Sequence, residues 1–368
     1  MNQTTSASSE FFAIIPAGGV GSRLWPLSRA SAPKFLHDLT GNGQTLLQDT
    51  WDRLRPLAGD KIMVVTGNVH AAAVAEQLPE LDADDLILEP SPKDSTAAIA
   101  LAAAVLYLRN PDVIIGSFAA DHVILDQGAF EATVLEAIEV AQLGNIVTIG
   151  LKPTEASVAF GYIHKGQRLS TKSAYRVQKF EEKPSIALAK KYVESGEYLW
   201  NAGMFIAPAK LLLEVLSKTE PKLHSEIMQL AQAWGTPTQQ QELSQTWPNL
   251  KKIAIDYSIA EPAAEQGLVA VVPGDFEWHD VGDFASIAEL QSQGRKGNLA
   301  VLGSAKVLSD SSSGILVSDT NRLVALIGLE DVIVVDTPDA LLITTKEHAQ
   351  KVKSLVDALK QTGHSELL

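Results

Sequence analysis

The chain has 368 residues, of which 46% are hydrophobic, and a formal net charge of −14. This length and composition can bury a large core and predict two domains. The acidic balance argues against a nucleic-acid binder or an anionic-membrane binder, because neither surface attracts an acidic protein. The absence of cysteine excludes disulfides and thiolate metal sites and agrees with a reducing compartment.

The first ten residues are rich in Ser, Thr, Asn and Gln. They lack the basic start and the apolar run of a signal peptide, so we interpret residues 1–10 as a disordered tail. No later window is apolar over the length that a transmembrane helix needs. We therefore expect a soluble, cytoplasmic protein that binds neither nucleic acid nor membrane.

An apolar run from Phe11 to Ile15 predicts a buried parallel strand, which a glycine-rich loop follows at residues 16–23. Gly18, Gly19 and Gly21 let the backbone approach a ligand closely and turn N–H groups toward an anion. Arg23 adds a planar charged fork for phosphate, and Lys34 adds a second positive charge. This composition predicts a triphosphate site.

The spacing of the loop separates three kinds of phosphate site. A Walker A loop needs a Lys after its last Gly, and none follows Gly21; a dinucleotide fingerprint needs a small residue where Leu24 stands. The remaining pattern, with Pro33-Lys34 behind it, resembles the signature loop of the sugar-phosphate nucleotidyltransferases. The string RLWPLSRASAPKFL is most similar to their mannose-1-phosphate guanylyltransferase branch. The resemblance implies that the nucleotide is bound by Ala17, Gly18, Gly19, Gly21, Ser22 and Arg23.

Strand-like and helix-like segments then alternate as far as residue 150, which predicts a mainly parallel sheet with right-handed connections. The resemblance implies an α/β fold: a Rossmann-like nucleotidyltransferase domain with a mixed, mainly parallel sheet at residues 11–293. Its nucleotide half would span residues 11–150 and its sugar half residues 151–293.

A polar turn follows the strand predicted at residues 86–89 and lies at the carboxyl edge of the sheet, where open α/β folds bind ligands. In the resembling family this turn reads the base, which implies nucleotide contacts for Pro90, Lys93, Asp94 and Ser95. The turn here departs from the family's usual Arg-Asn-Thr-Ala-Pro-Ala. Asp94 could accept hydrogen bonds from guanine or cap the next helix, and we favour the cap.

Two acidic residues follow or end strand-like runs. Asp121 comes after the buried run at 112–117, and Asp280 lies in the run Trp278 to Gly282. Asp121 alone would be interpreted as a turn residue. The resemblance makes Asp121 and Asp280 the metal ligands, and Mg²⁺ is the natural ion for an oxygen-only site on phosphates. His279 could be a third ligand, but a lone histidine beside such an Asp is more often outside the ligand set.

Three short motifs in residues 151–293 resemble, in this order, the family's sugar-phosphate pocket. They are Gly161-Tyr162-Ile163, the segment VQKFEEKP at 177–184 and the segment WNAGMF at 200–205. By that match Gly161 leaves room for a sugar ring against the backbone, Glu182 and Asn201 bind sugar hydroxyls, and Lys183 binds the sugar's phosphate. Lys179 or Glu181 would point to the opposite face of the strand.

Short β-rich strings from residue 298 to residue 340 predict a β-sandwich or a β-helix. The resemblance favours a left-handed β-helix, so we expect a C-terminal β-helix-like domain at residues 294–368, closed by a helix at 346–361. That domain often dimerises in the family, which implies a homodimer. For the apolar face of the closing helix we favour packing on its own domain over a contact between subunits.

The resemblance implies transfer of GMP from GTP to α-D-mannose 1-phosphate with release of pyrophosphate. A sugar phosphate has a second pKa of about 6, so its attacking oxygen is already anionic and needs no general base. Arg23, Lys34 and Lys183, with Mg²⁺, would neutralise the two anions that meet. Two alternatives stay open: a nucleotidyltransferase that uses dTTP, UTP or ATP with glucose 1-phosphate, and a non-catalytic sensor of nucleotide sugars. Paired metal ligands argue against the sensor.

Overall fold

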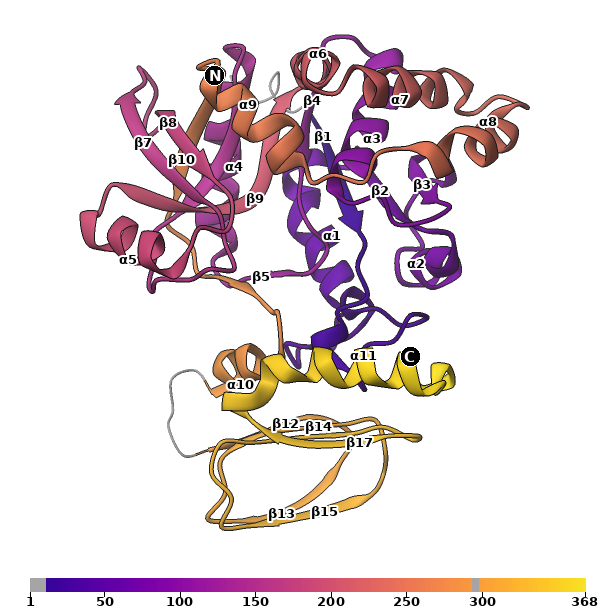
Figure 1. Cartoon of the computed structure of the whole chain (residues 1–368), viewed down its shortest axis with the longest axis vertical. Coiled ribbons are helices and arrows are strands. Elements are labelled where there is room, and N and C mark those ends of the chain that lie inside the picture. The colour runs from indigo at the N-terminus through magenta and orange to yellow at the C-terminus, as the bar shows by residue number, and fades with distance from the viewer. Residues whose placement is uncertain (1–10, 293–297) are drawn as a thin grey trace.

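The computed structural model describes residues 11–292 and 298–368. The tail predicted at residues 1–10 and the domain boundary predicted at 293/294 therefore lie outside the described residues. Figure 1 shows a large α/β body and a smaller β-rich body, with helix α11 (Val352–Thr362) running between them. None of the helices within the described ranges has the length and apolar character needed to cross a membrane.

A nine-stranded sheet with the order β3-β2-β1-β4-β9-β6-β10-β8-β7 forms the centre of the α/β body. The strands are β1 (Phe11–Ala17), β2 (Ile62–Gly67), β3 (Leu86–Glu89), β4 (Ile114–Ser117), β6 (Ile146–Leu151), β7 (Tyr162–Arg168), β8 (Tyr175–Glu181), β9 (Tyr198–Pro208) and β10 (Val269–Gly274). Strands β3, β2, β1 and β4 are parallel neighbours, as the alternating pattern predicts. Strand β9 enters antiparallel between β4 and β6 and makes the sheet mixed.

Helices cover both faces of this sheet because side chains alternate along each strand. In β1, Ile14 belongs to the core under α3, α6 and α7, whereas Ala13 and Ile15 belong to the core under α1 and α4. Helix α3 lies between the sheet and two other helices, so its Ala-rich sequence is buried almost all round. The helices are α1 (Leu46–Ala58), α2 (Ala71–Gln77), α3 (Ser95–Arg109), α4 (Gln127–Gln142), α5 (Ile186–Ser195), α6 (Ala209–Thr219), α7 (Pro221–Ala233), α8 (Gln239–Thr246), α9 (Glu261–Glu265) and α10 (Phe284–Ser292).

The C-terminal body is a β-helix, as the resemblance predicted, and the β-sandwich alternative is wrong. Its strands are β12 (Leu299–Gly303), β13 (Lys306–Asp310), β14 (Gly314–Ser318), β15 (Leu323–Ile327), β16 (Val332–Asp336) and β17 (Leu341–Thr345). Strands β12, β14 and β16 stack in parallel, so that Leu302, Val317 and Val335 lie in register. Strands β13 and β15 pair in parallel on the opposite face (Figure 1).

The closing helix packs inside the chain, but against both bodies. A 3₁₀ segment (Lys346–Lys351) leads into α11. Its buried Ala349 and Val352 share one core cluster with Leu24 of the α/β body and Ile333 of the β-helix. The face thus packs on its own domain, as we favoured, and it also covers Leu24 of the α/β body, which the sequence did not predict.

Candidate active site

Three neighbouring cavities lie along the carboxyl edge of the sheet, and Asp121 lines all three. The loop cavity, of about 590 Å³, contains Gly21, Ser22, Arg23, Lys34 and Asp280. The β3 cavity, of about 390 Å³, contains Gly18, Gly19, Glu89, Lys93, Asp94 and Ser95. The β9 cavity, of about 230 Å³, contains Gly161, Glu182, Asn201, Asp256 and Asp280. The structure thus brings most of the predicted site residues to one place.

The glycine-rich loop is shaped by Gly21, which adopts a positive φ of 69°. A Cβ atom at this position would lie 2.8 Å from Cβ of Lys34. Any side chain here would therefore be strained and would also displace Lys34. The loop runs into a short 3₁₀ turn (Ser22–Leu24), and a second one (Lys34–Leu36) begins with the lysine itself.

Lys34 lies between two carboxylates in the loop cavity. Its Nζ is 3.0 Å from Oδ2 of Asp121 and 3.4 Å from Oδ1 of Asp280. Burial acts to lower the pKa of Lys34, but the two carboxylates outweigh it and the pKa is raised. Burial likewise acts to raise the pKa of Asp121, and the neighbouring ammonium outweighs it, so that pKa is lowered. Lys34 and Asp121 are therefore both charged at neutral pH.

The two carboxylates reach this position through a small antiparallel sheet of β5 (His122–Ile124) and β11 (Trp278–Asp280), which pairs Asp280 with His122. Within residues 11–292 and 298–368, no group of three or more His, Asp or Glu side chains is placed to hold a metal ion. A cation here would take Asp121, Asp280 and oxygens from phosphate or water, a ligand set that suits Mg²⁺. His279 instead contacts Glu277 at 3.1 Å.

The β3 cavity contains a buried acid that the sequence analysis did not single out. Glu89, the last residue of β3, is 8% exposed, and among the described residues its Oε1 has no hydrogen-bond partner. Burial raises the pKa of Glu89 from 4.5 to about 7. Its position at the end of a strand on the carboxyl edge could have identified it. A buried acceptor with free capacity is suited to a ligand that presents hydrogen-bond donors.

The other residues of the turn that we expected to read the base have structural partners. Asp94 caps α3, as we favoured, and its side chain accepts a hydrogen bond from the Ser95 N–H at 2.9 Å. The Lys93 ammonium donates to the carbonyls of Pro248 at 2.6 Å and Leu250 at 3.0 Å. Lys93 therefore fixes the segment before residue 251 against the cavity wall.

The β9 cavity is built around Asn201, which is 7% exposed. Its Oδ1 accepts from Thr148 at 2.8 Å and from the Gly203 N–H at 3.1 Å, and its Nδ2 donates to Asp256 at 3.0 Å. Asp256 begins a π-helical turn (Asp256–Ala260). Burial, followed by the charge of Glu182, raises the pKa of Asp256 to about 7. Asp256 is not among the site residues predicted from the sequence.

Gly161 lines the β9 cavity and lies beside the Glu182 side chain. A Cβ atom on Gly161 would overlap Oε2 of Glu182 and would lie 3.3 Å from Cβ of Asn201. The missing side chain therefore makes room for the Glu182 carboxylate.

Three predicted residues are absent from the described linings of the three cavities: Ala17, Pro90 and Lys183. Lys183 lies beside the β9 cavity with a φ of 48°, and its Nζ is 3.1 Å from Oε1 of Glu182. Lys179 and Glu181 pair with each other at 2.6 Å and both contact Tyr192, away from the cavity.

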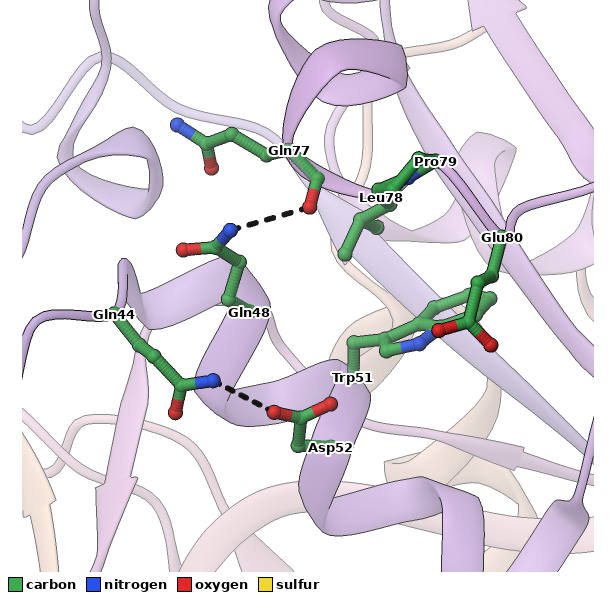
Figure 2. Close-up of a pocket in the computed structure, with 8 residues that line it drawn as sticks. All are labelled: Gln44, Gln48, Trp51, Asp52, Gln77, Leu78, Pro79 and Glu80. Carbon is green, nitrogen blue, oxygen red and sulfur yellow. Dashed lines mark hydrogen bonds between the residues drawn. The ribbon is translucent and has the colours of Figure 1, made fainter.

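A separate pocket of about 120 Å³ lies between α1 and the end of α2 (Figure 2). Gln48 donates to the Gln77 carbonyl at 3.2 Å, and Gln44 donates to Asp52 at 2.7 Å. These polar groups already have partners, and the pocket contains none of the predicted residues. We assign it no function.

The chain resembles known proteins over both bodies. Residues 12–297 match the family model of a nucleotidyl transferase, and residues 305–359 match that of a MannoseP isomerase/GMP-like beta-helix domain. The Xanthan biosynthesis protein XanB of Xanthomonas campestris pv. campestris is 36% identical over 97% of this chain and 75% of its own length. The mannose-1-phosphate guanylyltransferase of Escherichia coli K12 is 34% identical over 98% of this chain and 76% of its own length. A crystal structure described as mannose-1-phosphate geranyltransferase from Thermus thermophilus superimposes with a TM-score of 0.84 and 31% identity, covering 95% of this chain and 99% of that one.

Proposed function

This chain belongs to the nucleotidyl transferase family, in the branch of the mannose-1-phosphate guanylyltransferases, and we propose that it transfers GMP from GTP to α-D-mannose 1-phosphate. The observation that carries this proposal is the meeting of three cavities at Asp121. The loop cavity has the cations and glycines that suit a triphosphate, the β3 cavity has a buried acceptor for a base, and the β9 cavity has the polar groups that suit a sugar.

The reaction joins two anions, so the main task of the protein is to neutralise and align them. An oxygen of the acceptor phosphate attacks the α-phosphorus of GTP, the bond from that phosphorus to the β-phosphate oxygen breaks, and pyrophosphate leaves. Arg23 and Lys34 neutralise the phosphates in the loop cavity, and the N–H groups near Gly18 and Gly21 add hydrogen-bond donors. No proton has to be removed from the acceptor near neutral pH.

Asp121 and Asp280 would hold a divalent cation, and Mg²⁺ fits two carboxylates that share one cavity with phosphates. Such an ion would supply further charge neutralisation at the phosphoryl group. The chain's own Lys34 keeps the two carboxylates close together. Mg²⁺ dependence of turnover is the direct test, with EDTA as the control.

Glu89 is the residue that we propose for recognition of guanine. Guanine presents an N1–H and an exocyclic amine on one edge, and an ionised carboxylate can accept from both. Adenine, thymine and uracil lack this pair of adjacent donors. We therefore expect a preference for GTP, with measurable use of another purine triphosphate because Lys93 and Asp94 are tied to structural partners.

In the β9 cavity, Glu182, Asn201 and Asp256 are proposed to bind the sugar, and Lys183 its phosphate. Because Glu182 fills the space above Gly161, we expect the sugar to contact this carboxylate directly.

An assay of pyrophosphate release tests the function. Four nucleoside triphosphates would each be combined with mannose 1-phosphate or glucose 1-phosphate. GTP with mannose 1-phosphate should give the highest kcat/KM. Highest activity with dTTP, UTP or ATP would instead identify another sugar nucleotidyltransferase, and binding without turnover would identify a sensor.

We further propose a cytoplasmic homodimer built through the β-helix. The outer face of β13 and β15 exposes Leu308, Leu323 and Ile327, of which Ile327 is 74% exposed. Light scattering after size exclusion should give twice the 39.4 kDa chain mass. Leu308→Lys combined with Ile327→Lys should give the monomer.

A further inference from the structure

The loop cavity includes two side chains from the C-terminal segment. Gln350 and Lys353 line it together with Arg23, Lys34 and Asp121 of the α/β body. The two residues are three positions apart around the start of α11, a spacing that puts them on the same side of a helix. A segment that continues the β-helix domain therefore forms one wall of the site.

Several contacts hold the C-terminal part of the chain against the glycine-rich loop and the residues that follow it. The indole nitrogen of Trp25 donates to the carbonyl of Leu367 at 2.7 Å, and Arg29 contacts the same carbonyl and Asp339. Helix α11 also contacts the 3₁₀ turn that carries Arg23. Together these contacts fix the position of α11 beside the loop.

The two side chains have different surroundings. The Oε1 atom of Gln350 accepts from Nη1 of Arg23 at 3.0 Å, and its Nε2 donates to the buried Asp283. Lys353 is exposed and makes no ion pair within the described ranges. Gln350 therefore orients Arg23. Lys353 instead places an ammonium, which has no ion-pair partner in the described ranges, in a cavity that suits anions.

We propose that Lys353 binds the β- and γ-phosphates of the nucleoside triphosphate, and that Gln350 is a positioning residue that acts through Arg23. This inference rests on the proposed function, because it names the groups that hold the triphosphate. Negative charge accumulates on the β-phosphate oxygen as its bond to the α-phosphorus breaks, and pyrophosphate leaves with that electron pair. A cation at this end of the loop cavity stabilises both the bound triphosphate and the departing pyrophosphate. The C-terminal domain thereby completes the active site.

The test for Lys353 compares Lys353→Ala with Lys351→Ala in the full chain. Lys351 is also exposed and precedes α11, but it does not line the loop cavity in the described residues. Lys353→Ala should raise the KM for GTP and the Kd for inorganic pyrophosphate about tenfold, as expected for loss of one charged contact. The KM for mannose 1-phosphate should stay within twofold of that of the wild type, and Lys351→Ala should resemble the wild type throughout.

The pyrophosphate titration by calorimetry separates the two possible failures. A wild type without turnover would refute the proposed function, yet its pyrophosphate affinity would still be measurable. Equal pyrophosphate affinity in Lys353→Ala, Lys351→Ala and wild type would overturn the role of Lys353, as would a wild type that binds no pyrophosphate.

A double-mutant cycle tests Gln350. Gln350→Ala should raise the KM for GTP by roughly threefold or more when Arg23 is present, and by much less in an Arg23→Ala background. If the effects of Gln350→Ala and Arg23→Ala on the KM for GTP simply multiply in the double variant, Gln350 does not act through Arg23.

Discussion

The ammonium nitrogen of Lys34 lies 3.0 Å from Oδ2 of Asp121, and the same nitrogen is 3.4 Å from Oδ1 of Asp280. The Lys34 side chain is 8% exposed, so these carboxylates are the groups that compensate its buried charge. Reciprocally, the ammonium lowers the repulsion between two acids that come from distant parts of the chain. Lys34 thus preforms a charged site before substrate arrives.

Replacement of Lys34 should lower both turnover and stability. Lys34→Met leaves two carboxylates side by side without a cation between them. Loss of one partner of a buried ion pair lowers the free energy of unfolding by about 3–5 kcal/mol. Because both acids are partly exposed to solvent, we expect a loss of about 1–3 kcal/mol here. Thermal unfolding with and without MgCl₂ would measure it, and Mg²⁺ should stabilise Lys34→Met more than the wild type. Unchanged melting temperatures with Lys34→Met in both conditions would contradict the arrangement.

The carboxylates themselves should be essential to turnover. Asp121→Asn and Asp280→Asn keep the shape of each side chain but remove the charge that a divalent cation requires. Each substitution should abolish Mg²⁺-dependent pyrophosphate release while circular dichroism stays unchanged. Asp112→Asn, in an exposed turn before β4, is the matched control. Near-normal activity of either variant would show that its Asp is not a ligand.

The sequence was sufficient for features that depend on local pattern. Alternating apolar runs predicted the parallel strands β1 to β4. The resemblance predicted the β-helix, which the short strands alone left open. Local pattern also favoured the cap at Asp94 over contact with the base.

Features that depend on distant contacts could not be predicted in this way. Nothing in the pattern of β9 indicates that it enters the sheet between β4 and β6. Likewise, the pattern around Gln350 reads only as a surface face of a helix, and its contact with Arg23 exists because α11 docks on the loop. For Glu89, the sequence indicates the position at the end of a strand, but its burial and raised pKa result from packing of the complete cavity.

Glu89→Gln should change nucleotide choice. A glutamine amide still accepts one hydrogen bond from guanine, but its NH₂ group then faces a second donor. Charge-assisted hydrogen bonds contribute about 1.5–3 kcal/mol, so kcat/KM for GTP should fall roughly tenfold to more than a hundredfold. The kcat/KM for ATP should change far less, so the quantity to measure is the ratio of kcat/KM for GTP to kcat/KM for ATP. A retained ratio would exclude Glu89 from base recognition.

The same variant should alter the dependence of stability on pH. Burial raises the pKa of Glu89 from 4.5 to about 7, so between these values the folded state holds a proton that the unfolded state has released. Wild-type stability therefore contains a penalty that grows as pH rises through this range and is complete above pH 7. Glu89→Gln lacks it. Relative to the wild type, the variant should gain about 2–3 kcal/mol in unfolding free energy between pH 5 and pH 8. Urea unfolding at pH 5 and pH 8 measures this gain. If the unfolding free energies of the variant and the wild type differed by the same amount at both pH values, the raised pKa of Glu89 would be contradicted.

The last prediction concerns Lys183, which lies at the rim of the β9 cavity with a side chain that is 60% exposed. Its partner in the structure is Glu182, and in the proposed arrangement only the acceptor's phosphate should reach it. Lys183→Ala should therefore raise the KM for mannose 1-phosphate, and leave the KM for GTP nearly unchanged. Because the ammonium is largely solvated, the effect should lie near the lower end for a charged contact, roughly tenfold.

Two controls separate lost chemistry from lost structure. Lys179→Ala removes a charge from the same strand region without touching the cavity, since Lys179 pairs with Glu181. Lys183→Gly removes the ammonium and also suits the positive φ of 48°, so it should reproduce the KM effect of Lys183→Ala with better stability. If Lys183→Ala weakened GTP binding and spared mannose 1-phosphate, the assignment of the β9 cavity to the sugar would be wrong. Lys34, by contrast, is proposed to contact the reacting phosphates in the loop cavity. Lys34→Ala should therefore lower kcat, because charge on those phosphates grows as the bond to the leaving pyrophosphate breaks.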